Sequence, residues 1–590
     1  MFLLKQVYQK IHELQHKDLK VNIMTMKKKL IILTLSVIGF LVILDTNIMN
    51  IAIPEIQSGL HVSLTDLSWA INIYTILFAS FLIPFGRIGD IVGHVKLLNI
   101  ALIVFAIGST ISGLASSLNV LLIGRSIQSI GAAVMLPSGM ILGFRQVEKD
   151  KRNKIIAIFA ATQALGAALG PTIGGFISQY FGWHWVFLIN VPLVVIVLVM
   201  NLLLLSMKNE VVKKIRIDFG GTVLIAGTLF LLTLSLVEGR NWNWLSLKTI
   251  GCLVSSLLLL VIFLYHEQHS SDPIIPLKLF RNRNYVGANV VIMITFIVLA
   301  SYIGIIPTFL TKVIGVSELH AALLITPMSI TLLFSTPIAT KLVGKVNSRI
   351  LVGFGIIILS ISVYLMGHLN LENNYNQLYL VDILLGLGIG SIAGPAMSIA
   401  VGRLEGTELT AAQNVLNVVR NIGMIIGIAL FLSLLDGNID SAKQNVHSYA
   451  TDRIENSKLP KVVQNKMINK VKGNANTSQI NSQSIKQPQI STDQTIKMAK
   501  TQTKIIIDTK SNAGIILPTE IKQQLYQKVL VTTQNKVKVI NHELKGIFKD
   551  VKQYIHNQLT DAFLKLYKWE LPFVVFGFLA VFIFKEKQYK

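Results

Sequence analysis

The segment "LGAALGPTIGG" (Leu165–Gly175) places glycines and a proline inside a long apolar run. Gly166, Gly170 and Gly174 recur at every fourth residue. Glycine and proline are the weakest helix formers in water. In a membrane, glycines at this spacing let two helices approach backbone to backbone, and a proline kinks the helix by removing a hydrogen bond. The segment therefore predicts a kinked transmembrane helix packed closely against a neighbour.

The composition of the whole chain supports a membrane protein. Of its 590 residues, 52% are hydrophobic and only 14% are charged, whereas soluble proteins carry about 25% charged residues. Apolar runs long enough to cross a bilayer recur almost from end to end. These runs are continuous, which disfavours a β-barrel, and the single Cys252 excludes a disulfide framework. We expect an all-α polytopic protein in a lipid bilayer.

The apolar runs predict fourteen transmembrane helices. They lie at residues 30–53, 68–86, 97–117, 120–143, 155–178, 185–206, 217–237, 249–266, 286–311, 318–340, 350–367, 377–402, 408–435 and 569–584. With both termini in the cytoplasm, most basic residues fall on the inner side, and the short external loops carry only Arg240, Lys248 and Lys312. This distribution fits the positive-inside rule. The net charge of +24 then reflects topology and requires no nucleic-acid partner.

These helices predict six regions along the chain. They are a basic cytoplasmic segment (1–29), a six-helix bundle (30–206), two linker helices with a cytoplasmic loop (207–285), five helices of a second bundle (286–435), a large extracellular segment (436–568), and the last helix with its tail (569–590). Met24 or Met26 is an alternative start to Met1.

The extracellular segment is expected to have two parts. Residues 474–503 are poor in aromatics and rich in Ser, Gln and Asn, which is typical of disorder. Residues 519–566 have apolar side chains at helical spacing and predict amphipathic helices. The segment is either a solvated appendage or a surface that binds lipid headgroups or anionic wall polymers.

Ionisable residues within the apolar runs are the candidates for chemistry, because each is costly in a membrane. Counting about 1.5 Å per residue, Asp45 and Arg125 lie at a shared depth, and so do Asp382 and Arg420. We therefore expect one acid–base pair in each half. An acid beside a buried arginine can carry a proton, although a pair that only fixes helix register is the alternative.

One helix combines several polar residues on a single face. Gln413, Asn417 and Arg420 lie at positions i, i+4 and i+7 of the run 408–435. Together with Asp382 they predict the lining of a substrate cavity. Interhelical hydrogen bonding is the alternative explanation for such a stripe.

A weak internal repeat relates the two halves. "PFGRIGDIVGHVKLL" (Pro84–Leu98) aligns without a gap to "PIATKLVGKVNSRIL" (Pro337–Leu351). Transporters are often built from such related halves. The second copy has Val343 where the first has Asp90.

Several motifs resemble those of a known family. Gly86, Asp90, Gly93 and Lys96 match the cytoplasmic signature of the major facilitator superfamily. "LDTNIMNIAIP" (Leu44–Pro54), "RSIQSIGAA" (Arg125–Ala133), "WHWVFLINVP" (Trp183–Pro192) and "NVLNVVRNIGMIIGIAL" (Asn414–Leu430) resemble the fourteen-helix drug:proton antiporters of that superfamily. His94 and Val95 depart from the usual basic residues of the signature.

The resemblance implies a fold and a mechanism. Gly166, Gly170, Pro171, Gly174 and Gly175 match the antiporter motif of the family. The implied fold has two six-helix bundles and two linker helices. In the implied mechanism Asp45 binds the proton, Arg125 tunes it, and the residues from Gly86 to Lys96 latch the cytoplasmic ends.

The function expected from these observations is proton-coupled efflux of amphipathic, cationic compounds from a bacterial cytoplasm, by a monomer in the plasma membrane. No phosphate-binding loop, enzyme motif or metal cluster is present in the sequence, so we expect no cofactor. Two alternatives stay open. One is an exporter of a native metabolite, and the other is a non-transporting sensor that works through residues 436–568.

Overall fold

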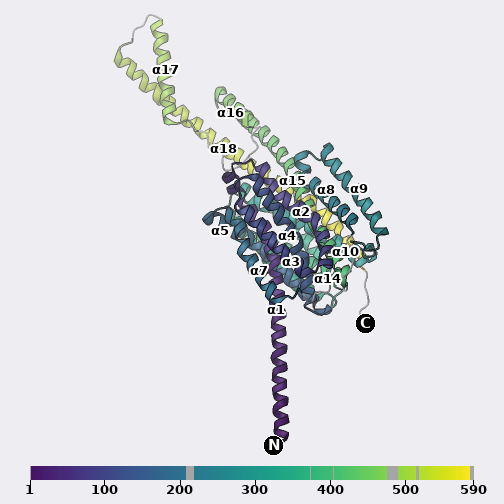
Figure 1. Ribbon diagram of the computed structural model, residues 1–590. Coiled ribbons are helices and arrows are strands. Elements are labelled where there is room, and N and C mark those ends of the chain that lie inside the picture. Colours follow the sequence, from purple (N-terminus) through teal and green to yellow (C-terminus); the bar gives the residue numbers. More distant parts are fainter. Residues whose placement is uncertain are drawn as a thin grey trace. The chain divides into compact units, whose positions relative to one another are not determined.

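The computed structural model describes residues 2–207, 218–371, 374–402, 404–474, 489–512 and 517–584, and this part of the chain contains helices and no strand. Its helices (Figure 1) are α1 (Phe2–Leu60), α2 (Leu64–Val92), α3 (His94–Gly113), α4 (Leu118–Arg145), α5 (Arg152–Phe181), α6 (His184–Leu188), α7 (Asn190–Leu204), α8 (Phe219–Trp242), α9 (Leu247–His269), α10 (Arg283–Phe309), α11 (Glu318–Leu324), α12 (Thr326–Leu342), α13 (Ser348–Met366), α14 (Asn376–Val401), α15 (Gly406–Glu455), α16 (Lys461–Asn474), α17 (Thr492–Asn512) and α18 (Thr519–Gly577). Four short helical turns are η1 (Lys149–Lys151), η2 (Leu277–Arg281), η3 (Leu310–Ile314) and η4 (Phe578–Ile583).

The chain divides into two compact units. The first comprises Met1–Pro307, Ser317–Ser433 and Leu566–Lys590, and the second comprises Thr308–Val316 and Leu434–Lys565. The helices α15 and α18 contribute residues to both units. All residues of the candidate site lie in the first unit.

The N-terminal helices of the first unit form a closely packed bundle. The helix α4 packs on α2 and α3, and α1 packs on α4, α5 and α7. Small residues permit these close approaches: a Cβ at Gly108 or Gly131 would lie 2.4 Å or 2.8 Å from backbone atoms of the facing helix. Because α4 is surrounded, nearly its whole surface is buried, and polar groups on it must find partners inside the bundle.

The C-terminal helices of the first unit pack in the same way. The helix α14 lies against α12 and α13. The helices α10 and α15 touch through glycine, because a Cβ at Gly427 would lie 2.5 Å from the Ile297 carbonyl oxygen. The helices α5 and α12 pack together and so join the two sets of helices. The linker helices α8 and α9 pair with each other, and α8 also contacts α2.

The turns within the expected repeat have a common feature. Gly93 separates α2 from α3 with a φ of 103°, and Gly344 lies between α12 and α13 with a φ of 86°. Residues with a side chain rarely adopt this backbone region. Each half therefore reverses direction at a glycine.

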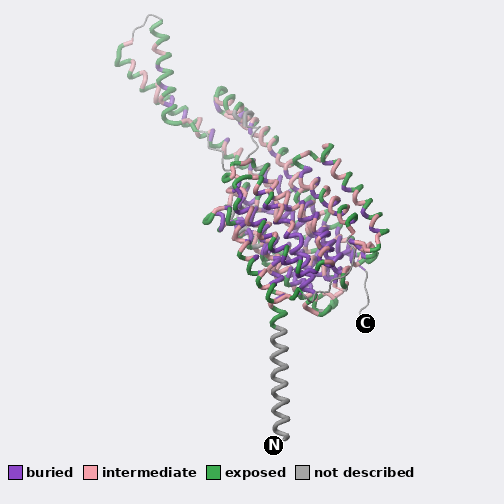
Figure 2. The backbone as a smooth tube through the Cα atoms, in the orientation of Figure 1, coloured by how far each residue is buried: buried purple, intermediate pink, exposed green. Residues whose placement is uncertain are grey.

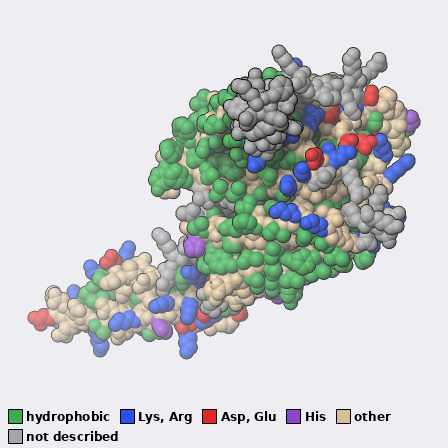
Figure 3. All heavy atoms as spheres, turned by 90° about the horizontal axis from the view of Figure 1, so that it is seen from below, with side chains coloured by type: hydrophobic (Ala, Val, Ile, Leu, Met, Phe, Trp, Pro, Cys, Tyr) green, Lys and Arg blue, Asp and Glu red, His purple; other side chains and the backbone are tan. Residues whose placement is uncertain are grey.

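The exposed surface is compatible with lipid. Buried residues concentrate among the packed helices (Figure 2), and hydrophobic side chains cover broad areas of the outer surface (Figure 3). Large apolar side chains on these areas are exposed, such as Leu203, Phe176 and Ile338. Contiguous apolar surface of this extent is unfavourable in water and is explained by a bilayer.

Thirteen helices in the described residues are long and apolar enough to cross a membrane. Residues 155–178, expected as the fifth transmembrane helix, lie within α5, which has 30 residues but is not one of these thirteen. The chain is thus a multi-pass membrane protein with an all-helical fold. The expected number of fourteen stays a prediction.

The second unit is also helical. A small apolar core joins α15, α16 and α18 through Ile454, Leu459, Leu544 and Ile547. The amphipathic helix expected at 519–566 is confirmed by α18. The disorder expected at 474–503 is wrong from Thr492 onward, where α17 begins with Thr495, Ala499 and Thr503 buried at every fourth residue. Residues 475–488 lie outside the described part of the chain.

Candidate functional site

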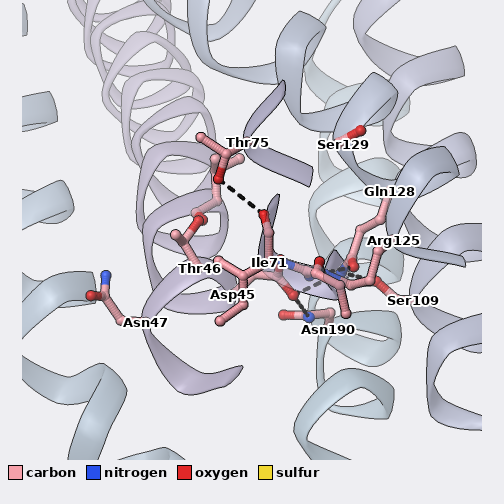
Figure 4. Close-up of polar contacts among 12 residues, drawn as sticks. Asp45, Thr46, Asn47, Ile71, Thr75, Ser109, Arg125, Gln128, Ser129 and Asn190 are labelled. Atoms are coloured by element: carbon pink, nitrogen blue, oxygen red, sulfur yellow. Dashed lines mark hydrogen bonds and ion pairs between the residues drawn. The ribbon is translucent and has the colours of Figure 1, made fainter. Parts of the chain in front are cut away.

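The expected pair of Asp45 and Arg125 is present in the first unit (Figure 4). Nη1 of Arg125, on α4, lies 2.8 Å from Oδ2 of Asp45, on α1. The Asp45 side chain is 0% exposed and the Arg125 side chain is 1% exposed. Removing either partner of such a buried pair is strongly destabilising, because it strands a charge away from water.

Two amide side chains also donate hydrogen bonds to Asp45. Gln128 Nε2 and Asn190 Nδ2 each donate to Oδ1 of Asp45 at 2.7 Å. Gln128 also accepts from Nη1 of Arg125 at 2.7 Å and donates to the Ser109 hydroxyl at 2.8 Å. The carboxylate therefore accepts hydrogen bonds from three side chains on α4 and α7. Sequence reasoning missed both amides, although Gln128 lies one helical turn after Arg125 and Asn190 lies in a motif that resembles the family.

Arg125 has contacts that do not depend on Asp45. Its Nε donates to the Ala70 carbonyl oxygen at 3.3 Å. Its guanidinium carbon lies 4.1 Å from the centre of the Tyr74 ring and 5.7 Å from that of Phe187. Aromatic faces attract cations by their quadrupole. The Ala70 carbonyl oxygen and two aromatic rings thus contact the guanidinium in addition to Asp45.

A proton on Asp45 would change the charge balance of this arrangement. The ionised carboxylate suits its donors, and the pair is neutral as a whole. A proton on Asp45 would remove the carboxylate charge and leave Arg125 as an uncompensated buried cation, which is costly. Protonation is therefore favourable only if the guanidinium moves or gains water.

The antiporter motif lies directly against the helix that carries Asp45. A Cβ at Gly166 would lie 2.8 Å from the Phe40 carbonyl oxygen, one at Gly170 would lie 2.7 Å from Asn47 Cβ, and one at Gly174 would lie 2.8 Å from Ile48 Cγ1. The glycine stripe thus brings α5 into backbone contact with α1 on both sides of Asp45. Gly175 is partly buried, and the side chain of Pro171 lies outside the described residues.

The signature residues at the α2–α3 turn join the two halves. Asp90 lies 3.2 Å from Nε2 of His94 and accepts a hydrogen bond of 2.9 Å from the Thr410 hydroxyl of α15. A Cβ at Gly86 would overlap the Asn414 side chain, also of α15. Gly93 forms the turn itself, and Lys96 is exposed. His94, where the family has a basic residue, is fully buried and also contacts Ser138 at 3.3 Å.

The second expected acid–base pair is not formed. No ion pair within the described residues joins Asp382 and Arg420; instead Tyr302 donates to Asp382, and Arg420 donates to Gln163 Oε1 on α5 at 2.9 Å. The reason is geometric: counting residues gives the depth of a side chain but not the direction in which it points. Arg420 thereby links α15 to α5, the helix of the glycine motif.

The rest of the polar stripe on α15 lies inside the protein. Gln413 is 0% exposed and Asn417 is 6% exposed. Neither polar atom of the Gln413 side chain has a hydrogen-bond partner in the described structure. Buried amides without partners are rare, because each costs a few kcal/mol, roughly. Gln413 is therefore available to a ligand or to water.

Comparison with known proteins places these features in a family. The family model for the Major Facilitator Superfamily matches residues 35–428. Several multidrug and antibiotic resistance proteins are among the relatives. The probable multidrug resistance protein EmrY of Escherichia coli (strain K12) is 26% identical over 404 residues, covering 68% of this chain and 79% of that protein.

Another relative and one solved structure extend the comparison. The riboflavin transporter RibZ of Clostridioides difficile (strain 630) is 25% identical over 409 residues, covering 69% of this chain and 88% of that protein. The solved structure of the proton:xylose symporter XylE matches with a TM-score of 0.51 at 13% identity, covering 70% of this chain and 90% of that one. The chain belongs to the Major Facilitator Superfamily.

Proposed function

We propose that the chain exports amphipathic, cationic small molecules across a bacterial plasma membrane in exchange for protons. It acts as a monomeric carrier, not as an enzyme, with both termini in the cytoplasm. The proton gradient is its energy source and no cofactor takes part. The drug-resistance relatives support the export of toxic compounds.

The observation that carries the coupling mechanism is the buried network around Asp45. Because Asp45 and Arg125 neutralise each other, a proton can bind Asp45 only when the guanidinium is displaced or hydrated. Because glycines of α5 make the contact with α1, no interlocking side chains oppose such a rearrangement. A proton arriving from outside would bind Asp45, break its ion pair with Arg125, and favour the state that accepts substrate from the cytoplasm.

The Asp90 region supplies the latch in this mechanism. Asp90 and Gly86 of the first half meet Thr410 and Asn414 of the second half. Breaking these contacts opens the protein to the cytoplasm, and re-forming them closes that side. While the cytoplasmic side is open, substrate would bind near Gln413 and Asn417 on α15, with adaptable apolar contacts around it.

The test is substrate transport driven only by a proton gradient. Everted vesicles are given an artificial pH gradient, acidic inside, without ATP, and a fluorescent lipophilic cation is added. Accumulation that disappears when a proton ionophore is added supports the proposal. Accumulation that needs ATP, or that the ionophore leaves unchanged, contradicts it.

One other candidate is favoured by a specific observation, the similarity to RibZ over most of the length of that protein. The chain would then transport a native metabolite of narrow range. The same vesicles distinguish the two functions, because a metabolite carrier would not accumulate structurally unrelated cations.

A further inference from the structure

A second group of polar side chains is buried in the C-terminal helices of the first unit. Its members come from three helices: Ser301 and Tyr302 from α10, Asp382 from α14, and Tyr567 and Glu570 from α18. Asp382, Tyr302 and Glu570 are 0% exposed, and Ser301 and Tyr567 are 1% exposed. The Asp45 network shares no residue with this group.

The two carboxyl groups are held by neighbouring residues of α10. The Tyr302 hydroxyl donates to Oδ1 of Asp382, and the Ser301 hydroxyl lies 2.7 Å from Oε1 of Glu570. No ion pair within the described residues includes either carboxyl, in contrast to Asp45. Within the part of the chain that the structure describes, the titratable groups of this cluster are the two carboxyls and the two tyrosines, and no cation pairs with them.

The contacts of Ser301 indicate the protonation state of Glu570. Besides Glu570, the Ser301 hydroxyl lies 2.8 Å from the Val298 carbonyl oxygen. A hydroxyl has one hydrogen, and both a carbonyl oxygen and an ionised carboxylate only accept. If Glu570 is protonated, its O–H donates a hydrogen bond to the Ser301 hydroxyl oxygen. The Ser301 O–H then donates to the Val298 carbonyl oxygen, so that both short contacts are hydrogen bonds.

The remaining polar atoms of the cluster lack partners. Oδ2 of Asp382, Oε2 of Glu570 and the Tyr567 hydroxyl make no hydrogen bond in the described structure. The Tyr567 hydroxyl interacts electrostatically with both carboxyl groups, so it lies in the same cluster. An ionised carboxylate with a bare oxygen and no cation would be far too costly inside a membrane. Neutral, protonated carboxyl groups are compatible with this environment.

From these contacts we propose that Asp382 and Glu570 form a second proton-binding site, in the C-terminal half, in addition to Asp45. The inference rests on the proposed proton-coupled function. It raises the number of protons that the carrier exchanges per substrate. It also reassigns Asp382 from the substrate cavity to proton binding. Each carboxyl holds its proton while the cluster is dry and releases it to water when rearrangement of α10, α14 and α18 admits solvent.

Infrared spectroscopy of the purified full-length protein tests the site directly. Protonated carboxylic acids have a carbonyl-stretch band that carboxylates lack and that shifts in heavy water. We expect this band at neutral pH in the wild type, and its loss as pH is raised. Asp382→Asn and Glu570→Gln should each remove the contribution of one carboxyl group. Ser301→Ala, which keeps Glu570, should shift the band without removing it.

Glu238→Gln is the matched control. Glu238 is also buried, but both of its oxygens accept from amides, Asn72 at 2.7 Å and Asn241 at 3.0 Å. Its substitution should leave the band unchanged. The proposal is overturned if the wild type has no such band at neutral pH or if both acid substitutions leave the band intact. Loss of the band on adding sodium at constant pH would identify a sodium site and also overturn the proton assignment.

Proton counting connects the site to transport. In proteoliposomes, the number of protons exchanged per substrate should fall in Asp382→Asn and Glu570→Gln and stay constant in Glu238→Gln. An unchanged ratio in both acid variants would overturn a role in coupling. A wild type that moves substrate without protons would instead contradict the proposed function, and the infrared titration would still decide whether the cluster binds protons.

Discussion

At the scale of single residues, the central feature is a carboxylate that is ion-paired, fully hydrogen-bonded and buried. Asp45 has a guanidinium and two amides as donors. Asp382 and Glu570 have only hydroxyl contacts. Buried carboxyl groups thus stand in two different environments, one that suits the charged form and one that suits the neutral form.

Removing Arg125 should destabilise the protein. Arg125→Ala leaves Asp45 buried without its cation, which we expect to cost about 3–5 kcal/mol in the free energy of unfolding. Asp45→Asn combined with Arg125→Ala should be less damaging than the sum of the single changes, because no stranded charge remains. Unfolding of the wild type and the three variants in detergent measures this coupling. Additive effects would show that the pair contributes nothing as a pair.

The sequence predicted part of this site. Helix rise gave Asp45 and Arg125 the same depth, and they do meet. The same reasoning was wrong for Asp382 and Arg420, because depth does not determine which face of a helix a residue occupies. Gln128, Asn190 and Glu570 were missed, since single polar residues in apolar runs are often explained by ordinary helix contacts.

At the scale of elements, the helix pair α1 and α5 decides whether the site can rearrange. The glycines of α5 face Phe40, Asn47 and Ile48, which flank Asp45 along α1. The periodicity of "LGAALGPTIGG" predicted a close helix contact. The sequence alone gave no means of knowing that the partner helix is the one carrying Asp45.

A larger side chain in this contact should impair transport. Gly170→Val would force a clash with Asn47, and overpacking of this kind costs about 1–3 kcal/mol. We expect a large fall in the initial rate of efflux at unchanged expression. Gly251→Val on α9 is the control, because a Cβ at Gly251 has no heavy atom within 4 Å. Equal rates in the two variants would rule out a special role for the α1–α5 contact.

The contact between Asp90 and Thr410 should hold the halves closed at that end. Thr410→Val removes a hydrogen bond to a charged group, worth about 1.5 kcal/mol, and so shifts an open–closed equilibrium by roughly tenfold. The reporter is Gln413→Cys, introduced at this buried position in a protein that also carries Cys252→Ser. Its thiol should react faster with a water-soluble thiol reagent when Thr410→Val is added. Thr110→Val, whose hydroxyl bonds within its own helix at 2.8 Å, should have no effect. An unaltered labelling rate would contradict the latch.

At the scale of the whole molecule, membership of the superfamily accounts for the first unit and leaves the second unit without an assigned task. Continuous hydrophobic runs predicted most of the helices that are long and apolar enough to cross a membrane, because bilayer thickness fixes their length. The helical second unit was harder to predict. The buried face of α17 is formed by the small residues Thr495, Ala499 and Thr503, which the search for large apolar side chains at helical spacing did not detect.

Removing the second unit should leave transport intact if the efflux account is correct. Asn438 Nδ2 donates to the Ala562 carbonyl oxygen at 3.0 Å, so a short glycine–serine linker can replace residues 439–561. We expect this shortened protein to retain the drug-efflux rate of the full chain. If the shortened protein retains the efflux rate but loses regulation of that rate, the second unit has a separate role. Complete loss of efflux in a correctly folded variant would contradict this expectation and show that transport needs the segment.

The most direct measurement of the central claim is proton flux in everted vesicles that contain the full-length protein. A pH-sensitive dye reports the gradient while a panel of lipophilic cations is added to wild type and to Asp45→Asn. The account predicts that the cations dissipate the gradient in the wild type and not in the variant. Equal dissipation in both, or none in either, would contradict the assignment of Asp45 as the coupling residue of a proton-driven exporter.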